Sequence, residues 1–241
     1  MTRKVLFLTV ALGGLMSFNL PASPITGTFN IAGSITVTPT TITWNLADSP
    51  FTPNKAVIGS PATGSFAGLP GSTVTISNLD LTLQPVNTPF PLTPFITFDS
   101  PAASSFPTLD INFIYPGTNL SSGCTATPPA VGQMCTPIAG PGPGPFNFQN
   151  TLPNPPAGPF STASFIFGGT TSDGLENWSG VFTSQFTVPY QAVLAQLAST
   201  GSVTNTFSAT FILTPTPESG TMALLGIGLI TLSAKLRRRR V

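Results

Sequence analysis

The chain has 241 residues; only 6% are charged, 41% are apolar and Phe contributes 19, which excludes a disordered tail and is unusual for a cytosolic enzyme. It contains no His, so the commonest general base and metal ligand is missing. Between residues 23 and 217 one base, Lys55, stands against six acids, and this net charge of −5, without a basic patch, excludes nucleic-acid binding.

Residues 1–22 predict a signal peptide. Arg3 and Lys4 precede an apolar stretch over residues 5–18, and a cleavage site follows at Ala22. A permanent anchor is the alternative, but the stretch is shorter than the roughly 18–20 apolar residues of a membrane span. We therefore expect export through the Sec translocon and removal of the peptide by signal peptidase.

Residues 23–214 predict one all-β domain. Apolar and polar residues alternate over residues 25–37, 42–44, 74–83, 95–98, 109–115, 163–167, 178–188 and 203–213. Strands with one apolar face need a second layer to cover it, so we expect an antiparallel two-sheet β-sandwich. Residues 109–115 are expected to place Leu109, Ile111, Phe113 and Tyr115 on the same face. One short helix is expected over residues 190–198, between Pro189 and Gly201.

Residues 128–159 contain ten prolines and predict an extended loop with no central strand through most of its length. Cys124 and Cys135 lie at its start and are expected to form a disulfide, worth roughly 2–3 kcal/mol for so short a loop. Free thiols and a metal site are the alternatives. Two thiolates without His supply only half of a tetrahedral zinc site.

Residues 215–241 predict a membrane-associated tail. A stretch of small and apolar residues over 221–234 is followed by Lys235, Leu236 and then Arg237, Arg238, Arg239 and Arg240. A transmembrane helix over residues 221–236 is short for a bilayer core of about 30 Å, and the arginine cluster should stay cytoplasmic. The body between the two ends is then translocated.

This tail resembles the PEP-CTERM sorting signal of Gram-negative bacteria. Pro217 and Glu218 match its motif, a small-residue helix and an arginine cluster follow, and Ser219 stands where the motif has a second Pro. The resemblance implies that a membrane-embedded exosortase cuts near Pro217 and Glu218 and delivers the body to the cell surface or extracellular matrix. It also implies an association with exopolysaccharide and biofilm. An ordinary C-terminal anchor is the alternative.

No catalytic group of residues stands out, and we expect neither a cofactor nor a bound metal. Carboxylate pairs could serve a glycoside hydrolase, but Asp48 and Asp99 lie in turns and Asp110 is expected to face solvent. Asp173, Glu176 and Asn177 could bind calcium, although a hairpin turn at Asp173 and Gly174 explains them as well. Four aromatic residues, Trp44, Tyr115, Trp178 and Tyr190, are expected in the core rather than on a sugar-stacking platform.

Three functions follow, in decreasing order of support. The first is a non-catalytic, exported surface or extracellular-matrix protein, anchored in the inner membrane until an exosortase processes it, with polysaccharide as a further partner. The second is a carbohydrate-binding module, which burial of Trp44 and Trp178 would count against. The third is a secreted glycoside hydrolase, which needs two accessible carboxylates at a suitable separation.

Overall fold

The computed structural model describes residues 24–48, 52–139, 142–152 and 160–216. The predicted signal peptide, the predicted transmembrane helix, Pro217, Glu218 and the four terminal arginines lie outside these residues. Within the described part of the chain, no helix is both long and apolar enough to cross a membrane.

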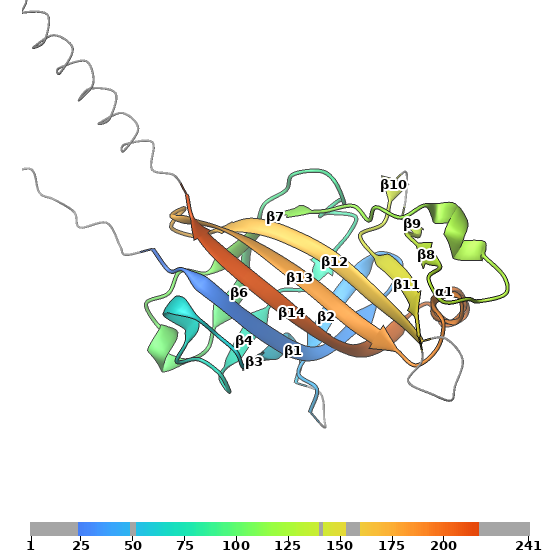
Figure 1. Ribbon diagram of the computed structural model, residues 1–241. Coiled ribbons are helices and arrows are strands. Elements are labelled where there is room, and N and C mark those ends of the chain that lie inside the picture. Colours follow the sequence, from blue (N-terminus) through green and yellow to red (C-terminus); the bar gives the residue numbers. More distant parts are fainter. Residues whose placement is uncertain (1–23, 49–51, 140–141, 153–159, 217–241) are drawn as a thin grey trace, which may run out of the picture.

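The main sheet closes into an antiparallel barrel of eight strands (Figure 1). In order around the barrel these are β13 (Glu176–Phe186), β14 (Val203–Pro215), β1 (Gly27–Val37), β3 (Lys55–Gly59), β4 (Thr73–Ile76), β6 (Leu92–Phe98), β7 (Leu109–Ile114) and β12 (Phe160–Thr171). Strand β12 pairs with β13 from Ser161 to Thr170 and completes the circle. The predicted two-sheet sandwich is therefore wrong: a closed sheet covers its apolar face with its own opposite wall, without a second sheet.

Further short elements extend the barrel. β1 pairs with β3 through residues 30–32 and with β2 (Thr41–Asn45) through residues 34–37, and β2 pairs with β5 (Leu79–Asp80). β11 (Asn147–Thr151) pairs with β12 and with β8 (Met134–Cys135), while β9 (Ile138–Ala139) and β10 (Gly142–Pro143) pair separately. The short 3-10 helices in the described part of the chain are η1 (Gly64–Phe66), η2 (Pro101–Ala103) and η3 (Ser121–Thr125).

Aromatic rings fill the barrel. Trp44 is fully buried, and its ring centroid lies 5.1 Å from those of both Phe182 and Phe207. Glycines opposite the large rings make the room: a Cβ on Gly180 would lie 2.8 Å from the Phe211 ring. Pairing large side chains with small ones fills a barrel of this size, so its middle is a packed core.

A β-bulge changes the predicted phase of β7. Phe113 pairs with Gly168 and Ile111 pairs with the adjacent Gly169, which leaves Asn112 as an extra residue. Ile114 therefore faces the core, whereas Tyr115 is 46% exposed and its ring lies 4.8 Å from that of Phe113. The prediction that Phe113 and Tyr115 share the face of Leu109 and Ile111 is wrong for this reason.

The proline-rich segment and the helix agree with prediction in outline. In the described parts of this segment, residues 128–139 and 142–152, the strands are two to five residues long, and the longest of them is β11. Helix α1 (Tyr190–Thr200) follows Pro189 and ends at Gly201, whose φ of 77° is the left-handed conformation that glycine adopts readily. The predicted disulfide between Cys124 and Cys135 is confirmed, with their Cα atoms 4.9 Å apart.

Candidate functional site

Helix α1 and the disulfide loop, residues 119–136, lie together at one end of the barrel (Figure 1). They share a small apolar cluster that is separate from the main core; its buried members are Cys135, Phe148, Ala163, Tyr190, Val193 and Val203. The cluster takes residues from α1, from the loop and from three strands. This end of the barrel, which we call the mouth, is therefore built from segments far apart in the sequence.

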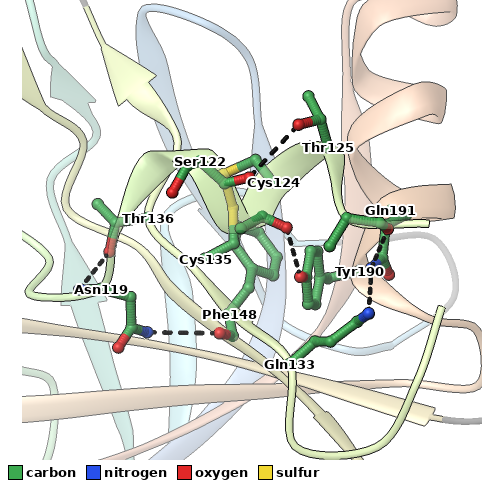
Figure 2. Close-up of a disulfide and its surroundings, with 12 residues drawn as sticks. Asn119, Ser122, Cys124, Thr125, Gln133, Cys135, Thr136, Phe148, Tyr190 and Gln191 are labelled. Carbon is green, nitrogen blue, oxygen red and sulfur yellow. Dashed lines mark hydrogen bonds between the residues drawn. A yellow bond between two sulfur atoms is a disulfide. The ribbon is translucent and has the colours of Figure 1, made fainter. Parts of the chain in front are cut away.

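Hydrogen bonds fix α1 against the disulfide loop (Figure 2). The Tyr190 hydroxyl donates to the Gly123 carbonyl at 2.8 Å, beside the disulfide. The Gln191 amide donates to the Ala126 carbonyl at 3.1 Å and to Gln133 Oε1 at 2.7 Å. Burial raises the pKa of Tyr190 above its usual value, so its hydroxyl remains a donor at neutral pH.

Asn150, which lies in β11, connects this strand to α1. Its side chain is fully buried, accepts the Tyr190 backbone N–H at 3.0 Å and donates to Gln191 Oε1 at 3.0 Å. Asn119 donates to the Phe148 carbonyl at 3.4 Å and so ties the start of the loop to the same strand. Helix, loop and strand form one unit.

An apolar pocket of about 250 Å³ lies between α1 and the mouth ends of β1, β12, β13 and β14. Its walls include side chains from the strands, from α1 and from the segment after the disulfide loop, among them Ile35, Phe148, Phe165, Val193, Leu194 and Leu197. Ile138, which is 68% exposed, stands at the rim. Apolar cavities at the mouths of β-barrels are common binding sites for small molecules.

The polar side chains in the wall are already hydrogen-bonded to the protein. Ser184 donates to the Thr206 carbonyl at 2.7 Å, and Asn205 donates to Ser184 Oγ at 2.9 Å and to the Gln185 carbonyl at 2.6 Å. Thr38 is bonded to the Thr41 hydroxyl at 2.7 Å. No Asp, Glu, Lys or Arg lines the pocket as the structure describes it. The wall therefore offers mainly apolar surface, and each of these three polar side chains is already hydrogen-bonded within the protein.

A second, more polar cavity of about 510 Å³ adjoins the pocket, which we call the side groove. The two share Pro39, Leu81 and Ala139 in their walls. The wall of the side groove also includes Thr40, Thr82, Asn87 and Thr88, which are neutral hydrogen-bonding residues. Together the two cavities present an apolar chamber beside one whose wall mixes apolar residues with neutral hydrogen-bonding residues.

Asp80 directly precedes Leu81 and Thr82, two residues in the wall of the side groove. Its Oδ1 accepts hydrogen bonds from the Thr82 hydroxyl at 2.6 Å and from the Thr82 backbone N–H at 2.9 Å. The hydroxyl bond, and after it the backbone bond, lower the pKa of Asp80. The carboxylate is therefore ionised at neutral pH and adds negative charge beside the groove.

Asp48, Asp99 and Asp110 also accept hydrogen bonds from the protein itself. Asp48 accepts from the Thr52 hydroxyl at 2.7 Å, and Asp99 accepts from Lys55 at 2.8 Å. Asp110 is only partly exposed, against the prediction that it faces solvent, and burial raises its pKa although the Thr108 hydroxyl opposes the shift. None of these residues lines the pocket.

Asp173 and Glu176 are brought close together. The Thr171 hydroxyl lies 2.7 Å from Asp173 Oδ1 and 2.7 Å from Glu176 Oε2. Glu176 is fully buried, and its Oε1 accepts the Ile25 backbone N–H at 2.6 Å, so it cannot contact a substrate. Asp173 accepts the Leu175 N–H within the turn. The pair is structural, and the described chain contains no group of three or more His, Cys, Asp or Glu placed to bind a metal.

Three of the four aromatic candidates are buried: Trp44, Trp178 and Tyr190. The Trp178 indole donates to the Asp110 carbonyl at 3.0 Å and so takes part in the core. Only Tyr115 is exposed. Burial of both tryptophans counts against a sugar-binding platform built on them.

The pocket was not predicted from the sequence. The available signal was the apolar side of residues 190–200, where Leu194 and Leu197 needed a surface to face, but the sequence did not identify that surface. Searches of protein-family models, curated proteins and solved structures found no match for this chain.

Proposed function

We propose that the chain is an exported, non-catalytic protein of the bacterial surface or extracellular matrix, with the tail that resembles a PEP-CTERM signal sorted by an exosortase. The observation that carries the proposal is the position of the two chain ends on the barrel. Gly27 at the start of β1 pairs with Leu213 near the end of β14, so the segments leading to both predicted sorting signals leave the barrel side by side (Figure 1).

The opposite ends of these strands form the mouth. Val37, at the end of β1, pairs with Val203, at the start of β14, and both line the apolar pocket. We call the end that carries Gly27 and Leu213 the tether end. A protein held by its tail would thus present the pocket away from the attachment point.

The disulfide and the acids also support the proposal. A disulfide between Cys124 and Cys135 persists in oxidising compartments outside the cytosol. Asp48, Asp80, Asp99, Asp110, Asp173 and Glu176 each accept a hydrogen bond from the protein itself. These acids serve turns, strands and one buried contact, as expected for a binding or structural protein.

Sorting is tested by the intact mass and location of the full chain, expressed in a Gram-negative host with and without an exosortase. We expect loss of residues 1–22 in both hosts and loss of the tail after the Pro217 and Glu218 region only with exosortase present. An intact, membrane-bound tail in both hosts would contradict sorting and indicate a plain anchor.

Two variants sharpen the test. Glu218→Gln removes the motif's acid and should reduce tail cleavage at least tenfold, while Ser219→Pro restores the motif and should increase it. Thr216→Ser, just before the motif, is the matched control and should be cleaved like the original. Cleavage unaffected by Glu218→Gln would show that another protease acts.

Carbohydrate binding is a second candidate, which the bulge in β7 favours. The bulge exposes Tyr115 beside Phe113 on the outside of the barrel, and exposed aromatic rings can stack on sugars. Tyr115→Ala should abolish binding to an array of bacterial polysaccharides, and Ile212→Ala, at another exposed apolar position, should leave it intact. Equal binding by both variants would exclude this face.

A further inference from the structure

The geometry points to a binding site for a neutral amphiphile at the mouth of the barrel. The hydrocarbon part would occupy the apolar pocket, and an uncharged hydroxyl-bearing or amide-bearing head would lie in the side groove. This inference does not depend on exosortase sorting, because it rests only on the two cavities and their walls.

The pocket suits a short hydrocarbon chain. Its volume of about 250 Å³ lies just below the roughly 300–1,000 Å³ of common ligand pockets, so a long or branched lipid would not fit inside it. Leu194 and Leu197 of α1 and Phe148 and Phe165 of the strands line it. Since Ser184 and Asn205 are bonded to each other and to backbone carbonyls, an apolar occupant would leave no buried polar group without a partner.

The residues of the side groove determine which headgroup the site accepts. Leu81 and Pro39 belong to both walls, so a molecule that enters the pocket can continue into the groove. Thr40, Thr82, Asn87 and Thr88 supply hydroxyl and amide groups there, without a base in the described wall to pair with an anion. The ionised Asp80 beside Thr82, and a body charge of −5, repel carboxylate and phosphate heads.

The concave shape favours a small molecule over a second protein. α1 and the disulfide loop are held together beside the pocket by the Tyr190 and Gln191 hydrogen bonds (Figure 2), and the walls come from segments between Ile35 and Asn205. Among the residues of the pocket wall, Pro39 and Ile138 are exposed, and the others are buried or half-buried. The site is therefore suited to a ligand that enters it.

Photolabelling of the full chain in host membranes tests this site. The probe is a decyl alcohol with a diazirine in its chain, and labelled peptides are mapped by mass spectrometry after digestion with pepsin. We expect label on residues 190–205, removed by excess decanol and at least tenfold less sensitive to decanoate at pH 8. Label confined to residues 217–241 would overturn the proposal, because it would show partition into the bilayer alone.

Variants of α1 provide the matched comparison. Leu194→Trp fills the pocket and should reduce labelling at the mouth at least tenfold, whereas Ala195→Trp, one residue on and exposed, should label like the original. Leu194→Ala enlarges the pocket, so in this variant a dodecyl probe should label the mouth more strongly than the decyl probe does. Circular dichroism checks that each variant is folded. Equal labelling of folded Leu194→Trp and Ala195→Trp, or decanoate competing as well as decanol, would overturn the proposal.

Discussion

Glu176 joins the start of β1 to the hairpin between β12 and β13. It is fully buried and accepts hydrogen bonds from the Ile25 N–H and the Thr171 hydroxyl. Glu176→Ala leaves both donors without this acceptor, so we expect the free energy of unfolding to fall by about 2–3 kcal/mol, measured by urea denaturation.

Asp173→Ala is the matched control for Glu176→Ala. Asp173 is an exposed carboxylate that contacts the same Thr171 hydroxyl, and its loss should cost less than about 1 kcal/mol. Equal losses in the two variants would mean that burial of Glu176 contributes nothing beyond an ordinary turn contact.

Asp99 gives the barrel an acid-sensitive contact. The largest single effect on the Asp99 pKa is partial burial, which raises it. Hydrogen bonds from Lys55, Thr73 and Thr75 and the charge of Lys55 act in the opposite direction. Together they outweigh burial, so the pKa of Asp99 is lowered. A lowered folded-state pKa stabilises the protein above the unfolded value of about 3.9, and this stability is lost as the pH falls through the folded pKa. Asp99→Asn should thus be less stable than the original at pH 7, and the difference should shrink as the pH falls below the unfolded value and through the lowered folded-state pKa.

Asp110→Asn should change the stability at neutral pH in the opposite direction to Asp99→Asn. Burial raises the Asp110 pKa, so its ionised form destabilises the fold at neutral pH and the penalty disappears as the pH falls below the unfolded value. We expect Asp110→Asn to be more stable than the original at pH 7. Urea midpoints between pH 3 and pH 7 measure both variants, and parallel curves would contradict the assignment.

At the scale of elements, the disulfide holds the loop that packs on α1. Replacing both Cys124 and Cys135 with Ser should lower the free energy of unfolding by about 3 kcal/mol, because a short loop is no longer closed in the unfolded chain. The effect should also be local: amide hydrogen exchange should rise in residues 119–136 and in α1 but not in β3 or β4.

The control for the serine variant is the original protein after chemical reduction. It should show the same stability and the same exchange pattern, because it keeps both side chains and lacks only the bond. Faster exchange throughout the barrel in either form would contradict a local role for the disulfide.

Alternation predicted the position of most long strands but not their irregularities. In β1 the expected inward residues Phe29, Ile31 and Ile35 are buried. In β7 the extra Asn112 reverses the phase, and the residues after Leu79 turn away, so that Leu83 is 69% exposed. A bulge depends on the pairing with Gly168 and Gly169 of a distant strand, which local periodicity does not contain.

At the scale of the molecule, the sequence predicted an all-β body but not its closure. Alternating strands require cover for one face, and both a second sheet and a closed barrel provide it. Closure is set by the pairings of β12 with β7 and β13, and the small residues that admit it, such as Gly169 and Gly180, are spread along the chain. The disulfide was predictable from two cysteines in a chain that the sequence predicts to be exported. The pocket was not, since its walls run from Ile35 to Asn205.

The two ends of the barrel differ in a way that predicts orientation. β14 has 13 residues and is about 44 Å long, so with the tilt of barrel strands the mouth lies about 30 Å from the tether end. If the tail anchors the chain in the membrane as proposed, the tether end should lie near the membrane and the pocket should face away from it. Its ligand would then be taken from the surroundings of the cell rather than from the bilayer below.

Fluorescence quenching by spin-labelled lipid headgroups measures this orientation in the full chain. A dye on Ser172→Cys, in the turn at the tether end, should be quenched, whereas a dye on Ala195→Cys, on the exposed side of α1, should not. Both positions are exposed, so labelling tests distance rather than burial. Stronger quenching at position 195 would place the mouth against the membrane and reverse the orientation on which this source of the ligand depends.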